Sequence, residues 1–215
     1  MNNYKKGQSA YDKKDYVQAV SFWKPLAERG NLLAIRSMGD LYFTGDLRDT
    51  CLPEDYDQAL YYFRLGSLQA DAYCLYKLGH FYKCGFGVKR DMQRAHKLYL
   101  QAIEQGSICA AHYLAMIYYW DDYKPDYNEA YYWLQYSAIK GFDDSHYFLS
   151  EMYLYGIKVE KNYMEAYKHY VLFNLNAVKD CIYAIDLNKK IKAVATPMHI
   201  HQAKHLAKEF QRKYY

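Results

Sequence analysis

The chain has 215 residues, of which 52% are hydrophobic and 24% charged, and it holds 28 tyrosines beside only 11 glycines and 4 prolines. This composition excludes a disordered chain, and the few helix breakers favour an all-helical fold. The net charge of +4 is too small to indicate a nucleic-acid binder.

The N-terminal segment MNNYKKGQSAYDKKDY contains no apolar stretch of the kind that signal peptides carry, and nowhere do eighteen apolar residues run together. We therefore expect a cytoplasmic protein that makes no membrane contact. The cysteines are odd in number and form no CxxC pair, so reduced thiols are favoured over a disulfide framework. They are Cys51, Cys74, Cys84, Cys109 and Cys181.

The first clear helical pattern is DYVQAVSFWKPLAERG at residues 15–30, and four copies follow it along the chain. Each copy begins with Asp or Asn, places an alanine four residues later and a bulky pair three and four residues after that. The alanines are 35 to 40 residues apart, a period that indicates stacked supersecondary units. These central alanines are Ala19, Ala59, Ala95, Ala130 and Ala166.

A second helical pattern lies between these copies, as in AIRSMGDLYFTG at 34–45 and CLYKLGHFYKCG at 74–85. A small residue is followed by a large apolar residue at i+4 and by a tyrosine at i+8, which forms one apolar helical stripe. The stripe recurs at 110–121 and 145–156. A further small residue after each large one lets a neighbouring backbone approach closely, and the aromatic rings fill the remaining volume.

Each unit is therefore predicted to be a helix, a turn and a second helix. Gly85 and Gly87 suit a turn with positive φ. The residues placed to cap the second helices are Asp15, Asp55, Asp91, Asp126 and Asn162. Two irregular turns, GDLRDTCLPED and YWDDYKPD, fit either a contact site or neutral loop variation.

The residues between 15 and 177 resemble the Sel-one-like repeat family, a branch of the tetratricopeptide-like α-solenoids. The segment 74–106 carries the resemblance best, and TPMHIHQAKHLAKEF resembles the closing helix of the family. Repeat three departs from the pattern by its missing glycines, and repeat four by three residues that replace small ones. The matching residues include LGHFYKCGFGV, Asp91, Ala95, Tyr99, Ala102 and Gly106, and the departures in repeat four are Ser150, Phe173 and Asn174.

Pattern and resemblance together predict an all-α fold, a right-handed α-solenoid of stacked antiparallel helix pairs that forms a single domain over residues 1–215. The tyrosine-rich stretch 126–141 is expected to supply core rings rather than a base-stacking platform, because such platforms need a basic groove that this region lacks. The predicted parts are an N-terminal helix pair over 3–30, repeats over 32–70, 72–106, 108–141 and 143–177, and capping helices over 178–215.

A solenoid offers a concave wall, which in this family is formed by the first helix of each pair. The face of these helices outside the apolar stripe is rich in the residue types that protein interfaces favour. We predict that this wall binds a protein or peptide, although each residue taken singly fits an ordinary solvated face equally well. The predicted partner-binding residues are Arg36, Asp40, Tyr76, Lys77, His80, Lys83, His112, Tyr113, Met116, Tyr119, Tyr147, Phe148 and Glu151.

Residues 178–215 contain eight basic and three acidic side chains and so carry the basic balance of the chain. A polar cap is favoured there over electrostatic steering of an acidic partner. His201 and His205 have a spacing that can hold zinc on a helix capped by Thr196, but no nearby cysteine or carboxylate completes the ligand set. We therefore predict no metal and no cofactor.

Catalytic motifs are lacking as well: the chain shows neither a phosphate-cradling glycine loop nor a serine elbow, and spacing identifies no Cys–His pair. We expect a non-enzymatic, monomeric protein-binding chain. The resemblance implies an adaptor or scaffold or, in bacteria, a virulence factor or an immunity protein that neutralises a toxin. A bacterial protein with one dedicated partner is preferred to a general adaptor, and a nucleic-acid-binding helical repeat is disfavoured.

Overall fold

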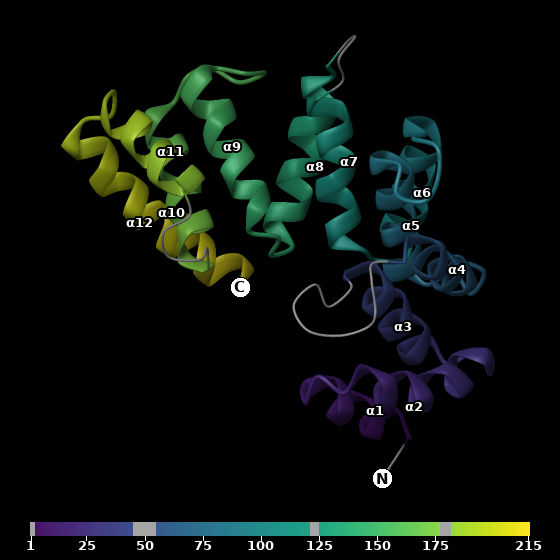
Figure 1. The fold of residues 1–215 in the computed structure, drawn as a ribbon. Helices are drawn as coiled ribbons and strands as arrows, with labels where there is room; N and C mark the ends of the chain where they lie inside the picture. The colour runs from purple at the N-terminus through teal and green to yellow at the C-terminus, as the bar shows by residue number, and fades with distance from the viewer. Residues whose placement is uncertain (1–2, 45–54, 121–124, 177–181) are drawn as a thin grey trace. The chain divides into compact units, whose positions relative to one another are not determined.

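The computed structural model describes residues 3–44, 55–120, 125–176 and 182–215, and all regular structure within them is helical. The chain forms two compact units, Met1–Ser107 and Ile108–Tyr215, here called unit 1 and unit 2. In each unit, the consecutive helices of the repeats pack against each other as antiparallel pairs (Figure 1). The predicted all-α fold of helix pairs is therefore confirmed.

Unit 1 is built from three helix pairs, and each of its helices packs against the next one in the chain. Its first pair is shorter than the others. The helices are α1 (Asn3–Asp12), α2 (Tyr16–Glu28), α3 (Leu32–Thr44), α4 (Tyr56–Ser67), α5 (Ala72–Cys84) and α6 (Met92–Glu104).

Glycines in the first helix of each pair of unit 1 make room for a ring from the second helix. A Cβ built at Gly39 would lie 2.6 Å from Cε1 of Phe63, and one built at Gly79 would lie 2.7 Å from Cε1 of Tyr99. Both rings are fully buried. The small residues of the repeat pattern therefore allow each pair to close tightly over an aromatic side chain.

Helix caps follow the predicted positions. The side chains of Asp55 and Asp91 accept hydrogen bonds from the backbone N–H groups of Gln58 and Arg94 and so begin α4 and α6. Gly85 has a φ of 81° and ends α5 in the left-handed conformation that glycine adopts without strain. The predicted caps are confirmed at Asp15, Asp55, Asp91, Asp126 and Asn162.

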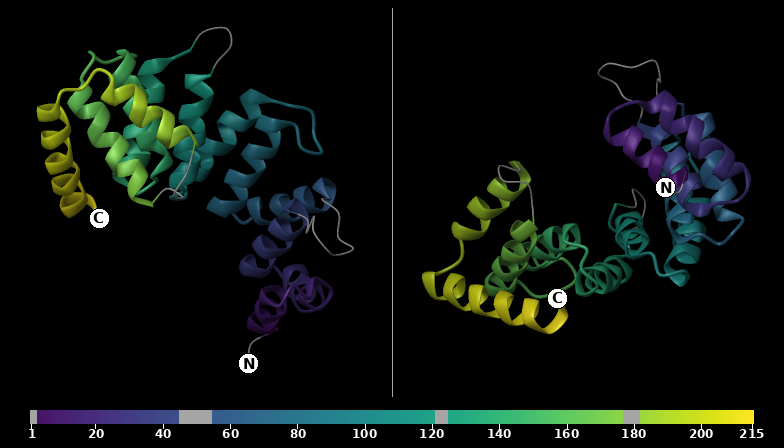
Figure 2. Two further views of the ribbon diagram at one scale, coloured as in Figure 1. Left: turned by 60° about the vertical axis from the view of Figure 1, so that its left-hand side comes forward. Right: turned by 90° about the horizontal axis from the view of Figure 1, so that it is seen from below.

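Unit 2 contains two helix pairs followed by two closing helices. The last helix lies along α10 (Figure 2), where Ala203 joins the same core cluster as Ala166 and Tyr170. Thr196 caps this helix, as predicted. The helices are α7 (Ile108–Tyr119), α8 (Tyr127–Ile139), α9 (Asp144–Tyr155), α10 (Tyr163–Asn176), α11 (Ile182–Lys192) and α12 (Pro197–Tyr214).

The stretch 126–141 was predicted to supply rings to the core, and the structure corrects this prediction. The core side of α8 consists of Ala130, Leu134, Ser137 and Ala138 rather than of its aromatic residues. Tyr132 is 57% exposed. The small and aliphatic side chains form the core side, while Tyr131 and Trp133 pack against the edge of this core cluster. The half-buried rings are Tyr131, Trp133 and Tyr136, and the exposed ones are Tyr127 and Tyr132.

No helix in the described part of the chain is long and apolar enough to cross a membrane. Cys74 and Cys84 are free thiols. Cys51, Cys181 and most of the two irregular turns lie outside the described residues, so the predictions for them stay predictions.

Candidate functional site

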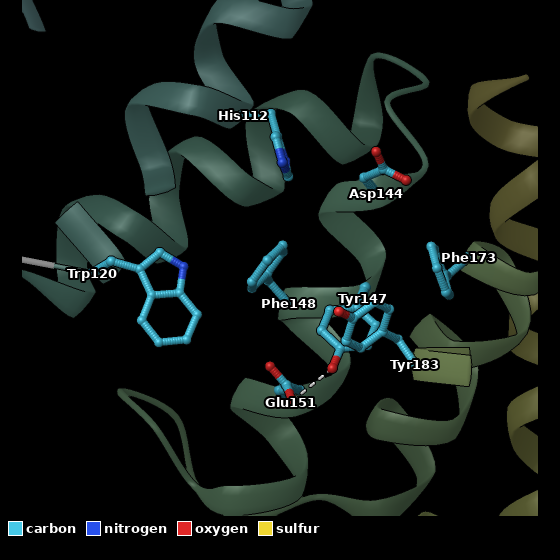
Figure 3. Close-up of a pocket in the computed structure, with 8 residues that line it drawn as sticks. All are labelled: His112, Trp120, Asp144, Tyr147, Phe148, Glu151, Phe173 and Tyr183. Atoms are coloured by element: carbon cyan, nitrogen blue, oxygen red, sulfur yellow. Dashed lines mark hydrogen bonds between the residues drawn. The ribbon is translucent and has the colours of Figure 1, made fainter. Parts of the chain in front are cut away.

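A cavity of about 490 Å³ opens in unit 2 among α7, α9, α10 and α11 (Figure 3). Its volume falls in the range of ligand pockets in proteins, roughly 300–1,000 Å³. Five of its eight lining side chains are large aromatics, and two are carboxylates. The lining residues are His112, Trp120, Asp144, Tyr147, Phe148, Glu151, Phe173 and Tyr183, here called the aromatic pocket.

Helix α9 supplies the floor of the aromatic pocket. Asp144, Tyr147, Phe148 and Glu151 follow one another at helical spacing, so they project from one face of α9. Figure 3 shows Phe148 and Tyr147 side by side there, with Trp120 on one side and Phe173 and Tyr183 on the other. The rings of Tyr147 and Phe148 meet edge to face, with centroids 5.2 Å apart.

A buried polar network holds α7, α8 and α9 in register beneath the pocket. Nδ1 of His112 lies 2.9 Å from Oγ of Ser145, which in turn lies 2.6 Å from Oγ of Ser137. All three side chains are buried. The His112 ring also lies 5.7 Å from the ring of Phe148, measured between centroids. His112 therefore positions the pocket floor and contributes one of its walls.

The carboxylate of Glu151 occupies an unusual environment for an acid. Tyr147 Oη donates a hydrogen bond to Oε1 of Glu151 over 3.0 Å. Burial raises the pKa of Glu151 above its ordinary value, and this effect outweighs the stabilisation of the carboxylate by the Tyr147 hydroxyl. Burial, with the neighbouring charge of Asp143, also raises the pKa of Asp144. The pocket therefore places two partly desolvated carboxyl groups beside aromatic rings.

Three of the predicted wall residues of unit 2 are buried, which corrects the expectation that they form a free face. Met116 is 5% exposed and Tyr119 is 8% exposed, and both belong to the core cluster that also holds Leu134 and Leu149. His112 is buried in the network described above. The pocket brings four predicted residues together, namely His112, Tyr147, Phe148 and Glu151.

Several predicted partner-binding residues of unit 1 instead form contacts between one repeat and the next. Arg36 forms a bidentate pair with Asp71, the cap of α5, so it connects one repeat to the next. Asp40 accepts a hydrogen bond of 2.7 Å from the hydroxyl of Tyr73 and pairs with Lys77 over 3.0 Å. These side chains stabilise the packing of α3 on α5.

The other predicted residues of unit 1 are also half-buried. The ring of Tyr76 stacks on Tyr99 with centroids 6.4 Å apart. Burial lowers the pKa of His80 to about 4 and also lowers the pKa of Lys83. Tyr113 in unit 2 is likewise half-buried. Partner binding by any of these residues stays a prediction.

The pocket contains four further residues that lie outside the predicted partner-binding set. Trp120 belongs to the irregular turn YWDDYKPD, which the sequence offered as a possible contact site, and Tyr183 lies in a segment predicted only to cap the chain; the two residues are 63% and 72% exposed. Asp144 is an acidic residue in the first turn of α9, a place where carboxylates are common in any helix. Phe173 carried a signal of a different kind, because it is a large ring where the repeat pattern has a small residue.

Within the described ranges, no group of three or more His, Cys, Asp or Glu side chains could hold a metal ion. His201 and His205, which have the spacing of a zinc pair, are both exposed on α12, and His205 lies 3.7 Å from Glu209. The side chains that line the aromatic pocket are mostly rings, with two carboxylates.

Comparison with solved structures identifies proteins with the same fold. A Sel1 repeat protein from Oxalobacter formigenes is 22% identical, covers 96% of this chain and 86% of its own, and has a TM-score of 0.73. A protective antigen of uropathogenic Escherichia coli that displays an SLR fold is 20% identical, covers 99% of this chain and 53% of its own, and has a TM-score of 0.55. At sequence identities of 20% and 22%, these structural similarities show a shared fold.

Among curated proteins, the chain is similar to the ERAD-associated E3 ubiquitin-protein ligase component HRD3 of Candida glabrata. The two are 29% identical over 88 residues, which are 41% of this chain and 10% of HRD3. The chain thus spans only a small part of this relative.

The family model of the Sel1 repeat matches most of the chain, and repeats of this family generally serve as scaffolds for protein–protein interaction. The matched residues are 3–31, 32–71, 72–107, 110–142 and 143–172. With five repeats matched over these residues, the chain belongs to the Sel1 repeat family.

Proposed function

We propose that the chain is a non-enzymatic protein-binding module whose aromatic pocket in unit 2 receives side chains of a dedicated protein partner. One observation carries the proposal: a cavity of about 490 Å³ is rimmed by two large rings, Trp120 and Tyr183, that remain mostly exposed. A partner that covers exposed rings beside an apolar cavity removes them from water, which makes the free energy of binding more favourable.

The composition of the pocket supports a protein rather than another class of partner. Tyrosine and tryptophan are the side chains that most often dominate binding free energy at protein interfaces. The family membership points the same way, since Sel1 repeats generally mediate protein–protein interaction. A nucleic acid is disfavoured because the two carboxyl groups of the pocket, Asp144 and Glu151, would repel its phosphates.

We further propose a cytoplasmic bacterial protein that sequesters a single partner, such as a toxin that it neutralises. The free thiols of Cys74 and Cys84 are compatible with a reducing compartment. A general adaptor with several partners is the alternative. The number of partners captured by the tagged chain from its native cell distinguishes the two.

The test measures the affinity of the captured and purified partner for three forms of the chain by calorimetry. Tyr183→Ala removes an exposed pocket ring, and we expect affinity to fall at least about tenfold. Tyr61→Ala removes an exposed ring of α4 in unit 1 and is the matched control. Equal affinities of the wild type and Tyr183→Ala would contradict the proposed role of the pocket.

A further inference from the structure

The position of Glu151 in its repeat has a counterpart in unit 1. Glu151 directly follows Ser150 in α9, as Asp40 directly follows Gly39 in α3, and Ser150 and Gly39 each come directly after the large apolar residue of the repeat pattern. The two acids therefore occupy the same register of the repeat. They differ in whether the chain itself supplies a cation.

In unit 1 the cation comes from the next repeat. Nζ of Lys77 in α5 lies 3.0 Å from Oδ1 of Asp40, and it also lies over the rings of Phe43 and Tyr73, 5.0 and 5.2 Å from their centroids. A cation between a carboxylate and aromatic faces is favoured both by charge pairing and by the negative potential of the ring faces. This register of the repeat can thus hold a cation between a carboxylate and rings.

In unit 2 the corresponding carboxylate lacks such a cation. No basic side chain among the described residues forms an ion pair with Glu151, and its one hydrogen bond comes from the neutral hydroxyl of Tyr147. Lys190, the basic group that acts on Glu151 from α11, is paired with Asp186 over 2.5 Å. The negative charge of Glu151 is therefore available to a cation from outside.

The rings around Glu151 favour the same kind of ligand. Tyr147 and Phe148 lie between Asp144 and Glu151 on one face of α9, and the two carboxylates are about 10 Å apart along the helix axis, at a rise of about 1.5 Å per residue. An anionic ligand would be repelled by both acids, and a neutral one would leave the half-buried carboxylate of Glu151 without a counter-charge. Only a cation is matched to both the rings and the charges.

We infer that the aromatic pocket binds a positively charged side chain of the partner, with arginine preferred to lysine. The inference rests on the proposed function and names the chemistry of the group that enters the pocket. The planar guanidinium stacks on aromatic faces, forms forked hydrogen bonds with a carboxylate and loses its weaker hydration more readily than an ammonium does. The partner thus presents arginine in an accessible segment.

The test uses peptides as the probe and the full chain as the target. Random peptides are selected by display against the wild type, and clones that bind Tyr183→Ala equally well are discarded, so that pocket-dependent peptides remain. Each basic residue of these peptides is then replaced: arginine by citrulline, its neutral near-isostere, and lysine by norleucine. Affinities are measured for the wild type, for Glu151→Gln and for Glu104→Gln, which removes an exposed charge from α6.

We expect the selected peptides to share an arginine whose replacement by citrulline weakens binding roughly tenfold in the wild type and in Glu104→Gln. In Glu151→Gln the same replacement should change affinity less than about threefold. Pocket-dependent peptides without a basic residue, or equal losses in the wild type and Glu151→Gln, would overturn the inference and leave the proposed function standing. Failure to obtain any pocket-dependent peptide would contradict both.

Discussion

Nδ1 of His146 lies 2.8 Å from Nδ1 of His169, and both imidazoles are buried in unit 2. The hydroxyl of Tyr215 donates to the carbonyl oxygen of Ala138 over 3.0 Å, and it lies 3.3 Å from Nε2 of His146. With its proton directed to Ala138, this hydroxyl accepts from Nε2–H of His146. His146 Nδ1 then accepts a hydrogen bond from Nδ1–H of His169. The chain of hydrogen bonds thus assigns a neutral tautomer to His146.

This pair predicts that unit 2 is destabilised by acid. Burial lowers the pKa of His146 to about 4 and that of His169 well below its ordinary value, and the positive charge of Lys168 acts in the same direction. The carboxylate of Glu165, 4.0 Å from Nε2 of His169, opposes the effect but pairs with Lys168. In the unfolded chain these two histidines take up protons below about pH 6.5, whereas in the folded chain they stay neutral. The free energy of unfolding therefore falls as pH decreases from 6.5 towards 4.

The expected loss from His146 alone is about 2 kcal/mol between about pH 7 and about pH 5. Hydrogen exchange of the α10 amides at the two pH values measures it. The double variant His146→Leu/His169→Leu, which removes both hydrogen-bonding partners at once, should lose much of this pH dependence. His205→Gln, which removes an exposed histidine of α12, should retain it. Equal pH dependence in the double variant would show that other groups cause it.

Asp71 is predicted to contribute more to stability than the other caps of unit 1. Burial alone would raise its pKa, but the hydrogen bonds from Arg36 and from the backbone N–H of Cys74 outweigh burial and lower the pKa. Asp71→Ala should lower the free energy of unfolding by about 2–3 kcal/mol, because it removes a cap and leaves Arg36 without its partner. Asp91→Ala, at an exposed cap without such a pair, should cost about 1 kcal/mol. Urea unfolding measures both, and equal losses would contradict the role given to the ion pair.

Gly79→Ala should destabilise unit 1 although alanine is the better helix former. The added methyl group would meet the buried ring of Tyr99, and such overpacking costs about 1–3 kcal/mol against a gain in helix propensity of about 1 kcal/mol. Repeat three shows which second change would relieve the overpacking. It has Ala115 at the position of Gly79 and Leu134 at the position of Tyr99. Adding Tyr99→Leu should therefore make the effect of Gly79→Ala neutral or favourable in a double-mutant cycle followed by urea unfolding. If Gly79→Ala is stabilising by itself, the close packing described here is wrong.

The sequence predicted the fold well because its signals are local and repeated. Caps such as Asp91, the turn at Gly85 and the closing helix after Thr196 each depend on a few neighbouring residues. Because the same pattern recurs along the chain, a weak match in one copy was supported by clear matches in the others.

The candidate site was predicted only in part because side-chain burial depends on neighbours from other helices. Tyr119 was placed on a free face, but Phe148 and Tyr127 cover it, with ring centroids 5.6 Å away in both cases. Its replacement by alanine would therefore test core packing rather than binding. For Trp120 the irregular turn YWDDYKPD left a contact site and neutral loop variation open. Tyr183 was missed because it lies outside the repeated helix pattern, and only the packing of α11 brings it to the pocket.

Site-specific photo-crosslinking to the captured partner tests the central claim most directly. A photoreactive phenylalanine analogue replaces Tyr183 at the pocket rim or, as controls, the exposed Tyr61 of unit 1 and the exposed Tyr132 of α8. We predict a crosslinked product from position 183 that excess unlabelled wild-type chain suppresses, and none from positions 61 and 132. Crosslinking from position 61 or 132 without a product from position 183 would contradict the assignment of the aromatic pocket as the partner-binding site.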